Sequence, residues 1–107
     1  MKTLKFRKEL VELIKNGSKN STWRIFDDKN ISEGDQFELI VWKTDKPFAI
    51  GKVTKVMEKP LGKLTFEDKK GHEEFSSYQE MYDTYSTYYG RSVGPDTKIK
   101  IIWFKLL

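Results

Sequence analysis

The chain has 107 residues, with 20 basic and 16 acidic side chains, a net charge of +4, one histidine and no cysteine. This length suits one compact domain with one core, and the composition excludes disulfides, thiolate metal sites and cysteine nucleophiles. A single histidine also argues against a histidine-based zinc site. We therefore expect one domain over residues 1–107, with no metal and no cofactor.

The sequence also predicts the cellular location of the protein and the kinds of partner that it can bind. Residues 1–7 lack the continuous apolar run of a signal peptide, and no later segment has the apolar length of a membrane span. We expect a cytoplasmic protein with no membrane partner, and we favour a monomer. The moderate basic excess permits a nucleic-acid partner without demonstrating one.

The first predicted elements are a short strand and an amphipathic helix. Leu4 and Phe6 alternate with basic residues, as in a strand with one buried face. Apolar residues then recur at the helical spacing of three and four, at Leu10, Leu13 and Ile14. Asn16-Gly17 predicts the end of the helix, because glycine adopts the left-handed conformation of a C-terminal cap.

A cluster of polar and aromatic residues follows this helix, over residues 17–24. If residues 22–25 are extended, Thr22 and Arg24 project to one face, and Lys19 reaches that face from the preceding turn. By the same alternation Trp23 is expected to point away. Such a cluster suits an anionic, planar or carbonyl-bearing ligand.

The middle of the chain predicts a pair of long antiparallel strands. Glu33-Gly34-Asp35 looks like a tight turn before a strand in which Phe37, Leu39 and Val41 alternate with other residues. A turn at Asp45-Lys46-Pro47 leads to a second strand that continues through Met57. Gly51 interrupts the alternation of this second strand, which suggests a bulge or a bend.

The last third predicts a polar loop, a helix and a strand. Residues 67–74 are almost wholly polar and are expected to form a surface loop. Ser76 or Ser77 is a suitable N-cap for a tyrosine-bearing helix, with Glu80 near the capping-box position, and this helix should end near Tyr89-Gly90. Residues 98–107 form an apolar, β-branched run that is typical of a central strand packed on both faces.

These elements predict an α+β fold built on a small mixed β-barrel of five to six strands, with two or more flanking helices. Its inner face should carry apolar side chains from four strands. They are Leu4, Phe6, Leu39, Val41, Val53, Ile99 and Ile101. The strand through Thr22 and Arg24 should then line a cleft between the barrel and the helices.

The order and spacing of four motifs resemble the ASCH domain of the PUA-like superfamily over nearly the whole chain. The motifs are Gly17-x-Lys19-x-x-Thr22-x-Arg24, Gly34-Asp35, Gly71-His72-Glu73, and Pro95-Asp96-Thr97-x-Ile99-Lys100-Ile101-Ile102-x-Phe104. The resemblance implies a PUA-like β-barrel whose cleft binds RNA or a modified nucleoside.

The resemblance also implies a possible reaction. Some small ASCH proteins are amidohydrolases that remove the acetyl group of N4-acetylcytidine with a lysine, a threonine and a glutamate. Carried over, these are Lys19, Thr22 and Glu73, with Glu74 competing for the last role. The chain departs from the amidohydrolase pattern at Asn20, where those enzymes carry a second threonine. Beside the resemblance, our candidates for ligand binding are Gly17, Ser21, Arg24, His72 and Tyr88. Tyr88, with Tyr89, is a candidate for base stacking because it lies past the helix face.

Elementary chemistry is compatible with such a site. A threonine hydroxyl is inert near neutral pH unless a neighbour takes its proton, and a lysine desolvated beside a cation such as Arg24 is easier to deprotonate. A glutamate can protonate the leaving amine. Arg24 is a candidate for holding an oxyanion or a phosphate.

Structural roles compete with these functional ones. Lys19 can complement a helix dipole, and Arg24 can pair with Asp27, Asp28 or Glu73. The hypotheses that remain are RNA or nucleoside binding without chemistry, hydrolysis of an acylated cytidine, a protein-interaction module, and RNA cleavage. We favour binding, with a candidate amidohydrolase site.

Overall fold

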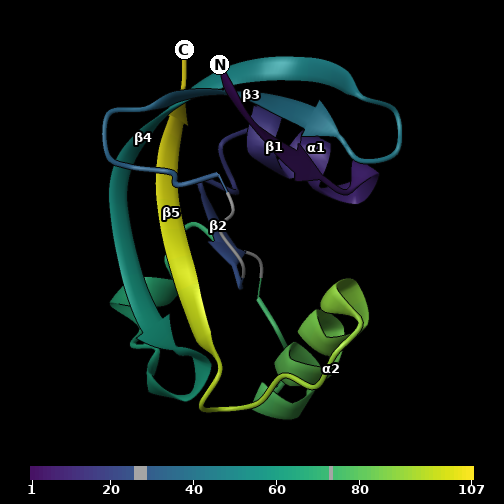
Figure 1. The fold of residues 1–107 in the computed structure, drawn as a ribbon, viewed down its shortest axis with the longest axis vertical. Coiled ribbons are helices and arrows are strands. Elements are labelled where there is room, and N and C mark those ends of the chain that lie inside the picture. The colour runs from purple at the N-terminus through teal and green to yellow at the C-terminus, as the bar shows by residue number, and fades with distance from the viewer. Residues whose placement is uncertain (26–28, 73) are drawn as a thin grey trace.

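The computed structural model describes residues 1–25, 29–72 and 74–107. The sheet and the two α-helices are arranged as Figure 1 shows. In chain order the elements are β1 (Lys2–Phe6), α1 (Lys8–Lys15), β2 (Ser21–Arg24), β3 (Gln36–Val41), β4 (Lys46–Pro60), α2 (Tyr78–Tyr89) and β5 (Lys98–Leu106). Short 3-10 helices cover Leu61–Lys63 and Glu67–Lys69.

One mixed sheet holds all five of these strands in the order β1-β3-β4-β5-β2. The β1–β3 pair is parallel, and the other three pairs are antiparallel. Because the 15-residue β4 pairs with β3 along its first half and with β5 along the rest, it carries the sheet around a curve, and the sheet forms a half-barrel (Figure 1). The predicted α+β class with a small mixed barrel is confirmed.

Two bulges alter which side chains face the interior. The register of the β3–β4 pair shifts between Leu39 and Ile40, so Ile40 is buried and Val41, predicted to line the interior, is only half-buried. The second shift lies between Val53 and Lys55 and not at Gly51. A side chain at Gly51 would press against the Phe37 ring opposite, so this glycine serves close packing.

The β3–β4 connection begins earlier than the sequence predicted. Residues 42–45 form the turn, and Lys43 and Asp45 adopt positive φ angles of 71° and 57° there. Lys46 and Pro47, predicted as turn residues, already pair with Val41 and Ile40. A turn that accepts two non-glycine residues in the left-handed region carries no strong sequence signal.

The buried side chains form two clusters that share β5. The cluster inside the half-barrel contains Leu4, Phe6, Phe37, Leu39, Val53, Ile102 and Phe104, together with Ile14 and Ile31. Ile99 and Ile101, which the sequence assigned to the barrel interior, instead join Trp23, Met81 and Tyr85 in the cluster beneath α2. The internal position predicted for β5 is confirmed, because β5 lies between β4 and β2.

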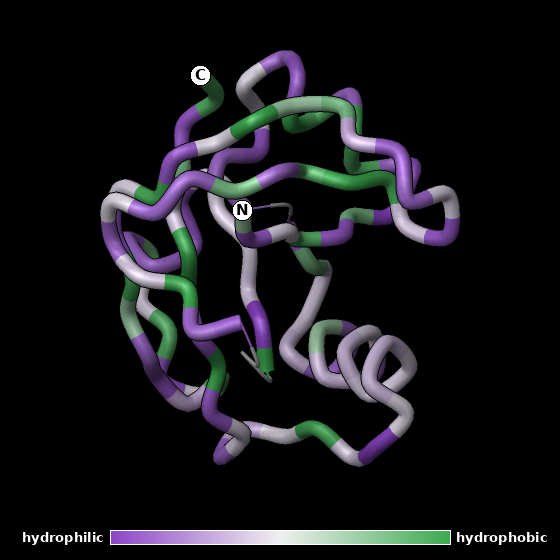
Figure 2. Tube along the Cα trace, turned by 45° about the horizontal axis from the view of Figure 1, so that its top comes forward, coloured by the Kyte–Doolittle hydropathy of each residue, from purple (hydrophilic) through white to green (hydrophobic). Residues whose placement is uncertain are grey.

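Helix α2 is capped much as the sequence predicts. The Ser77 side chain accepts a hydrogen bond from the Glu80 N–H at 3.0 Å, and Gly90 ends the helix with a φ of 66°. Glu80 bonds one residue further back than a capping box requires, since its carboxylate accepts from the Ser76 N–H and hydroxyl. In Figure 2 this helix is mostly pale, because tyrosine has an intermediate hydropathy.

The polar segment 67–74 is not wholly a surface loop, because Asp68 and His72 are buried. The Asp68 carboxylate accepts hydrogen bonds from the Lys59 ammonium at 2.6 Å and the Thr65 N–H at 2.9 Å. Burial disfavours the charged carboxylate, but these bonds outweigh it and lower the pKa of Asp68. Asp68 therefore anchors the start of this segment to Lys59 of β4.

Candidate functional site

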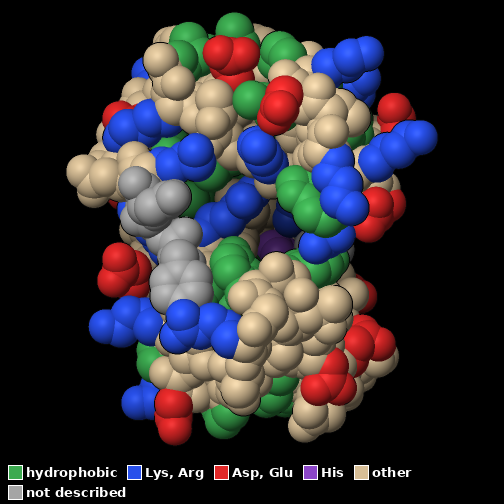
Figure 3. Space-filling view, turned by 45° about the vertical axis from the view of Figure 1, so that its right-hand side comes forward, with side chains coloured by type: hydrophobic (Ala, Val, Ile, Leu, Met, Phe, Trp, Pro, Cys, Tyr) green, Lys and Arg blue, Asp and Glu red, His purple; other side chains and the backbone are tan. Residues whose placement is uncertain are grey.

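A cavity of about 280 Å³ lies between α2 and the inner side of the half-barrel. Figure 3 shows it as a hollow at mid-height, edged by basic side chains with the single histidine visible inside. Four cationic residues line it: Lys5, Arg7, Lys19 and Arg24. Its walls include five indole or phenol side chains, from Trp23, Trp42, Tyr85, Tyr88 and Tyr89. No acidic residue lines the cavity among the residues that the structure describes.

Lys19 is held in the cavity by the end of α1. Gly17 has a φ of 85°, and the Lys19 N–H donates to the Leu13 carbonyl at 2.9 Å, so the chain turns sharply after the helix. Only 2% of Lys19 is exposed. A lysine is rarely so buried, and surface roles such as complementing a helix dipole do not require it.

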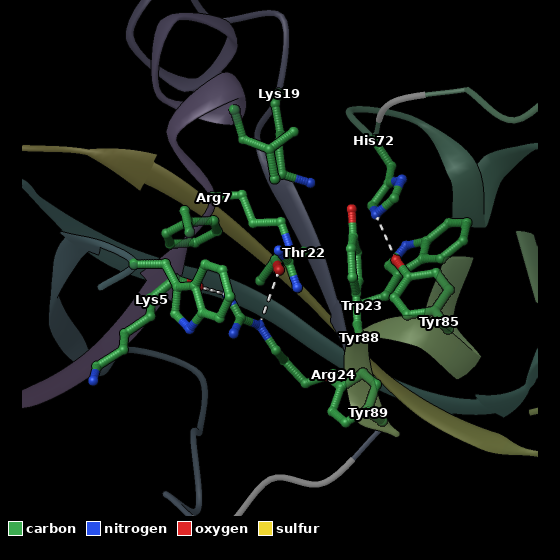
Figure 4. A pocket seen from close by; sticks show the side chains of 13 residues that line it. Lys5, Arg7, Lys19, Thr22, Trp23, Arg24, His72, Tyr85, Tyr88 and Tyr89 are labelled. Atoms are coloured by element: carbon green, nitrogen blue, oxygen red, sulfur yellow. Dashed lines mark hydrogen bonds between the residues drawn. The ribbon is translucent and has the colours of Figure 1, made fainter. Parts of the chain in front are cut away.

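Thr22 and Arg24 lie on the same face of β2, as the alternation of a strand predicts. The Arg24 Nε donates to the Thr22 hydroxyl oxygen at 3.1 Å, and Nη2 donates to the Lys5 carbonyl at 2.9 Å (Figure 4). Since β1 and β2 are the two edges of the sheet, Arg24 links those edges across the opening of the half-barrel. This places a guanidinium against a hydroxyl inside the cavity.

Trp23 lines the cavity as well, contrary to the expectation that it would point away. Its indole stacks on the His72 ring at a centroid distance of 3.8 Å, and His72 Nε2 lies 3.2 Å from the Tyr85 hydroxyl. These rings separate the first cavity from a second one of about 580 Å³ beyond His72. The alternation of β2 holds, but Trp23 packs beneath α2, and residues of α2 also bound the cavity, so its indole still contributes to the wall.

The Trp23 Nε1 is buried without a hydrogen-bond partner among the described residues. Leaving such a donor unpaired costs about 1–3 kcal/mol. Unpaired buried groups are unusual in folded proteins and concentrate at strained or functional places.

The rim of the cavity is formed by three elements that lie far apart in the sequence. The Arg7 guanidinium lies 4.2 Å from the Trp42 ring centroid and 4.0 Å from the Tyr88 ring centroid. Tyr88, a predicted stacking residue, is 43% exposed on this rim. The hydroxyl of Tyr89 accepts instead from the Ile25 N–H, which ties α2 to the end of β2.

The structure brings together Lys19, Thr22, Arg24, His72 and Tyr88 of the predicted site. Gly17 and Ser21 do not line the cavity: Gly17 shapes the turn, and the buried Ser21 hydroxyl donates to the Lys70 carbonyl at 3.4 Å. Glu73 lies outside the described residues, as do Asp27 and Asp28, the candidate partners of Arg24. Glu74 is described, and it lines the second cavity.

Sequence reasoning missed other residues of the site. Lys5, Arg7, Trp42 and Tyr85 all line the cavity without having been chosen. The first two alternate with apolar residues in a strand pattern, and this pattern gives no sign that they face a cavity. Trp42 opens a turn whose position the sequence did not mark, so its 40% exposure is visible only in the structure.

This half-barrel of five strands with a cavity beside α2 has the fold of solved ASCH-domain structures. Comparison with solved structures identifies the same architecture. An ASCH domain from Lactobacillus crispatus matches with a TM-score of 0.68 at 16% identity, covering 92% of this chain and 70% of that one. The sequence matches no protein-family model and no curated protein.

Two further structures share the fold. A DUF984-family protein from Enterococcus faecalis has a TM-score of 0.74 at 19% identity, covering 92% of this chain and 70% of that one. The hypothetical protein PH0355 has a TM-score of 0.75 at 22% identity, and the match covers 100% of both chains. These likenesses define the fold, and the function has to be argued from the cavity.

The described residues also bear on membranes and metals. Neither α-helix in the described part is long and apolar enough to span a bilayer. Within residues 1–25, 29–72 and 74–107, no group of three histidine, aspartate or glutamate side chains is arranged to hold a metal ion.

Proposed function

We propose that this protein binds a nucleoside unit of RNA, or a free modified nucleoside, in the cavity beside α2. The observation that carries the proposal is the gathering of three cationic side chains, Arg7, Lys19 and Arg24, and several aromatic walls in one small cavity; the Lys5 ammonium pairs instead with Asp45 at 3.2 Å. Aromatic faces stack on bases, and lysine and arginine bind phosphates and base edges. The volume of about 280 Å³ is near the lower end for ligand sites, which favours one nucleoside over a folded RNA surface.

Binding to short single-stranded RNA tests this proposal. Lys19→Ala and Arg24→Gln should each weaken binding about tenfold or more, because each removes a buried or partly buried cationic donor. Lys63→Ala is the matched control, since Lys63 is exposed and does not line the cavity. Equal affinities for all variants in fluorescence titrations would contradict the proposal and favour a protein-interaction surface.

Hydrolysis of N4-acetylcytidine is a second candidate, which the Arg24–Thr22 hydrogen bond favours. A cation that donates to the Thr22 oxygen stabilises negative charge on that oxygen as its proton leaves. In the proposed reaction the Thr22 oxygen attacks the acetyl carbon while a neutral Lys19 amine takes the hydroxyl proton. That proton is delivered to N4 as the C–N bond breaks. Water then cleaves the Thr22 ester and releases acetate.

Release of cytidine from N4-acetylcytidine, followed by chromatography, tests this reaction. Thr22→Ala and Lys19→Ala should each abolish turnover, whereas Thr54→Ala should leave it unchanged because Thr54 is an exposed residue that does not line the cavity. No turnover by the wild-type protein at high concentration would rule out hydrolysis and leave the binding proposal in place.

A further inference from the structure

The Arg7 guanidinium contacts two aromatic rings at the rim of the cavity. Its Cζ lies 4.2 Å from the centre of the Trp42 ring and 4.0 Å from the centre of the Tyr88 ring. A guanidinium carries five N–H donors and no acceptor. Among the described residues, none accepts a hydrogen bond from Arg7, and none forms an ion pair with it. Figure 4 shows this side chain reaching into the cavity.

The position of these contacts is set by three separate elements. Arg7 joins β1 to α1, Trp42 opens the β3–β4 turn, and Tyr88 is in the last turn of α2. The Trp42 N–H donates to the Phe6 carbonyl at 2.8 Å, which fixes Trp42 beside the end of β1. The fold therefore fixes the ring partners of Arg7.

Ring stacking has a specific consequence for the guanidinium. Both ring centroids lie within 4.2 Å of the Arg7 Cζ, and neither ring takes up the N–H donors, which can bind two oxygens of one phosphate. A side chain already held in this way loses less conformational entropy on binding than a free arginine does. Arg24 cannot serve in the same manner, because its Nε and Nη2 already bond within the protein.

The difference in depth between Arg7's ring partners and Lys19 supports a phosphate site at the rim of the cavity. Trp42 and Tyr88 are 40% and 43% exposed, whereas Lys19, in the same cavity, is 2% exposed. The cavity thus has a deep part and a rim that faces solvent. A nucleoside unit with its base in the deep part would place an attached phosphate near the rim.

We infer that Arg7, held by Trp42 and Tyr88, is a phosphate receptor, so that the cavity selects nucleosides that carry a phosphate ester over free nucleosides. This inference rests on the proposed function, since it assumes that a nucleoside unit occupies the cavity. The phosphate ester belongs either to a free nucleotide or to an RNA strand, and the two sources share the chemistry that Arg7 recognises.

Calorimetric titration of the four ribonucleosides, their 5′-monophosphates and the matching dinucleoside phosphates tests the inference. The wild type should bind a monophosphate or a dinucleoside phosphate about tenfold or more tightly than the parent nucleoside. Preference for the dinucleoside phosphate identifies an RNA strand as the source, and preference for the monophosphate identifies a free nucleotide. Arg7→Gln should remove the preference, because it should weaken binding of the phosphate esters far more than binding of the parent nucleosides.

Three further variants sharpen the test. Arg7→Lys should retain only part of the preference, since an ammonium lacks the planar fork. Trp42→Leu should also reduce it, because one stacking face is lost. Arg91→Gln, which removes one positive charge outside the cavity, should match the wild type. Circular dichroism confirms that each variant is folded.

The failures of the two proposals are distinguishable. If the wild type binds nucleosides but binds their phosphates no more tightly, or if Arg7→Gln weakens both equally, the phosphate receptor is wrong and the nucleoside site stands. If the wild type binds none of these compounds, the proposed function itself is wrong and the inference falls with it.

Discussion

Gly71 connects the loop of His72 to the strand of Thr22 through a single carbonyl group. Its oxygen accepts hydrogen bonds from the N–H groups of Asn20 at 2.8 Å and Ser21 at 3.0 Å. Its φ is 78°, in the region that favours glycine, and a Cβ at this position would overlap the Asn20 side chain. Asn20, where the amidohydrolase pattern has threonine, is therefore packed against this glycine.

Replacing Gly71 by alanine should destabilise the protein by about 1–3 kcal/mol, because strain and steric overlap add. The same change should weaken ligand binding, since His72 is the next residue. Gly94→Ala is the control: the φ of Gly94 is not positive, and nothing lies within 4 Å of a Cβ there. Urea unfolding measures both variants, and equal unfolding midpoints would disprove the role of Gly71.

At the scale of elements, α2 supplies one wall of the cavity. The stability of this helix depends on the capping of its first turn. Met81 and Tyr85 are buried from this helix, and Tyr88 reaches the rim. The Ser77 side chain is the only described side-chain cap at the N-terminus of either α-helix, since Arg7 at the start of α1 makes no capping bond. Loss of this cap should affect the helix before the sheet.

Ser77→Ala should lower the free energy of unfolding by about 1 kcal/mol, because an N–H of the first turn loses its acceptor. Ser92→Ala is the control, since Ser92 is exposed and lies outside the elements. Thermal denaturation followed by circular dichroism compares the two. A larger loss in Ser92→Ala than in Ser77→Ala would contradict the capping assignment.

At the scale of the whole molecule, the free energy of unfolding should decrease as the pH becomes acidic. Hydrogen bonds from the Lys2 side chain and the Ser32 N–H lower the pKa of Asp35, and the pKa of Asp68 is lowered as described above. Hydrogen bonds from the backbone and hydroxyl of Ser76 lower the pKa of Glu80. In each case the unfolded chain binds more protons than the folded protein does, so stability rises with pH through this range.

The contribution of these carboxylates should be complete above their ordinary pKa of about 4 and should fall as the pH drops through the lower folded-state values. Asp68→Asn should cost about 1–3 kcal/mol at pH 7, since its buried charged hydrogen bonds are lost. The difference from the wild type should shrink below about pH 3. Urea midpoints at several pH values measure this, and a constant difference at every pH would contradict it.

The sequence by itself determined most of the local structure. Alternation and helical spacing placed the strands and helices, and Asn16-Gly17 and Ser77 marked helix ends, because these signals depend on backbone conformation within a few residues. The grouping of Lys19, Thr22 and Arg24 was predictable for the same reason, since all three lie within one turn and one strand.

Only the tertiary structure decided the rest. The bulge after Leu39, the burial of His72 and the place of Trp23 in the cavity wall depend on partners distant in the sequence. Arg7 meets Trp42 and Tyr88 only because the curved sheet brings the β1–α1 junction to the β3–β4 turn and to α2. Periodicity reports which face of an element is apolar, whereas a cavity depends on how whole elements meet.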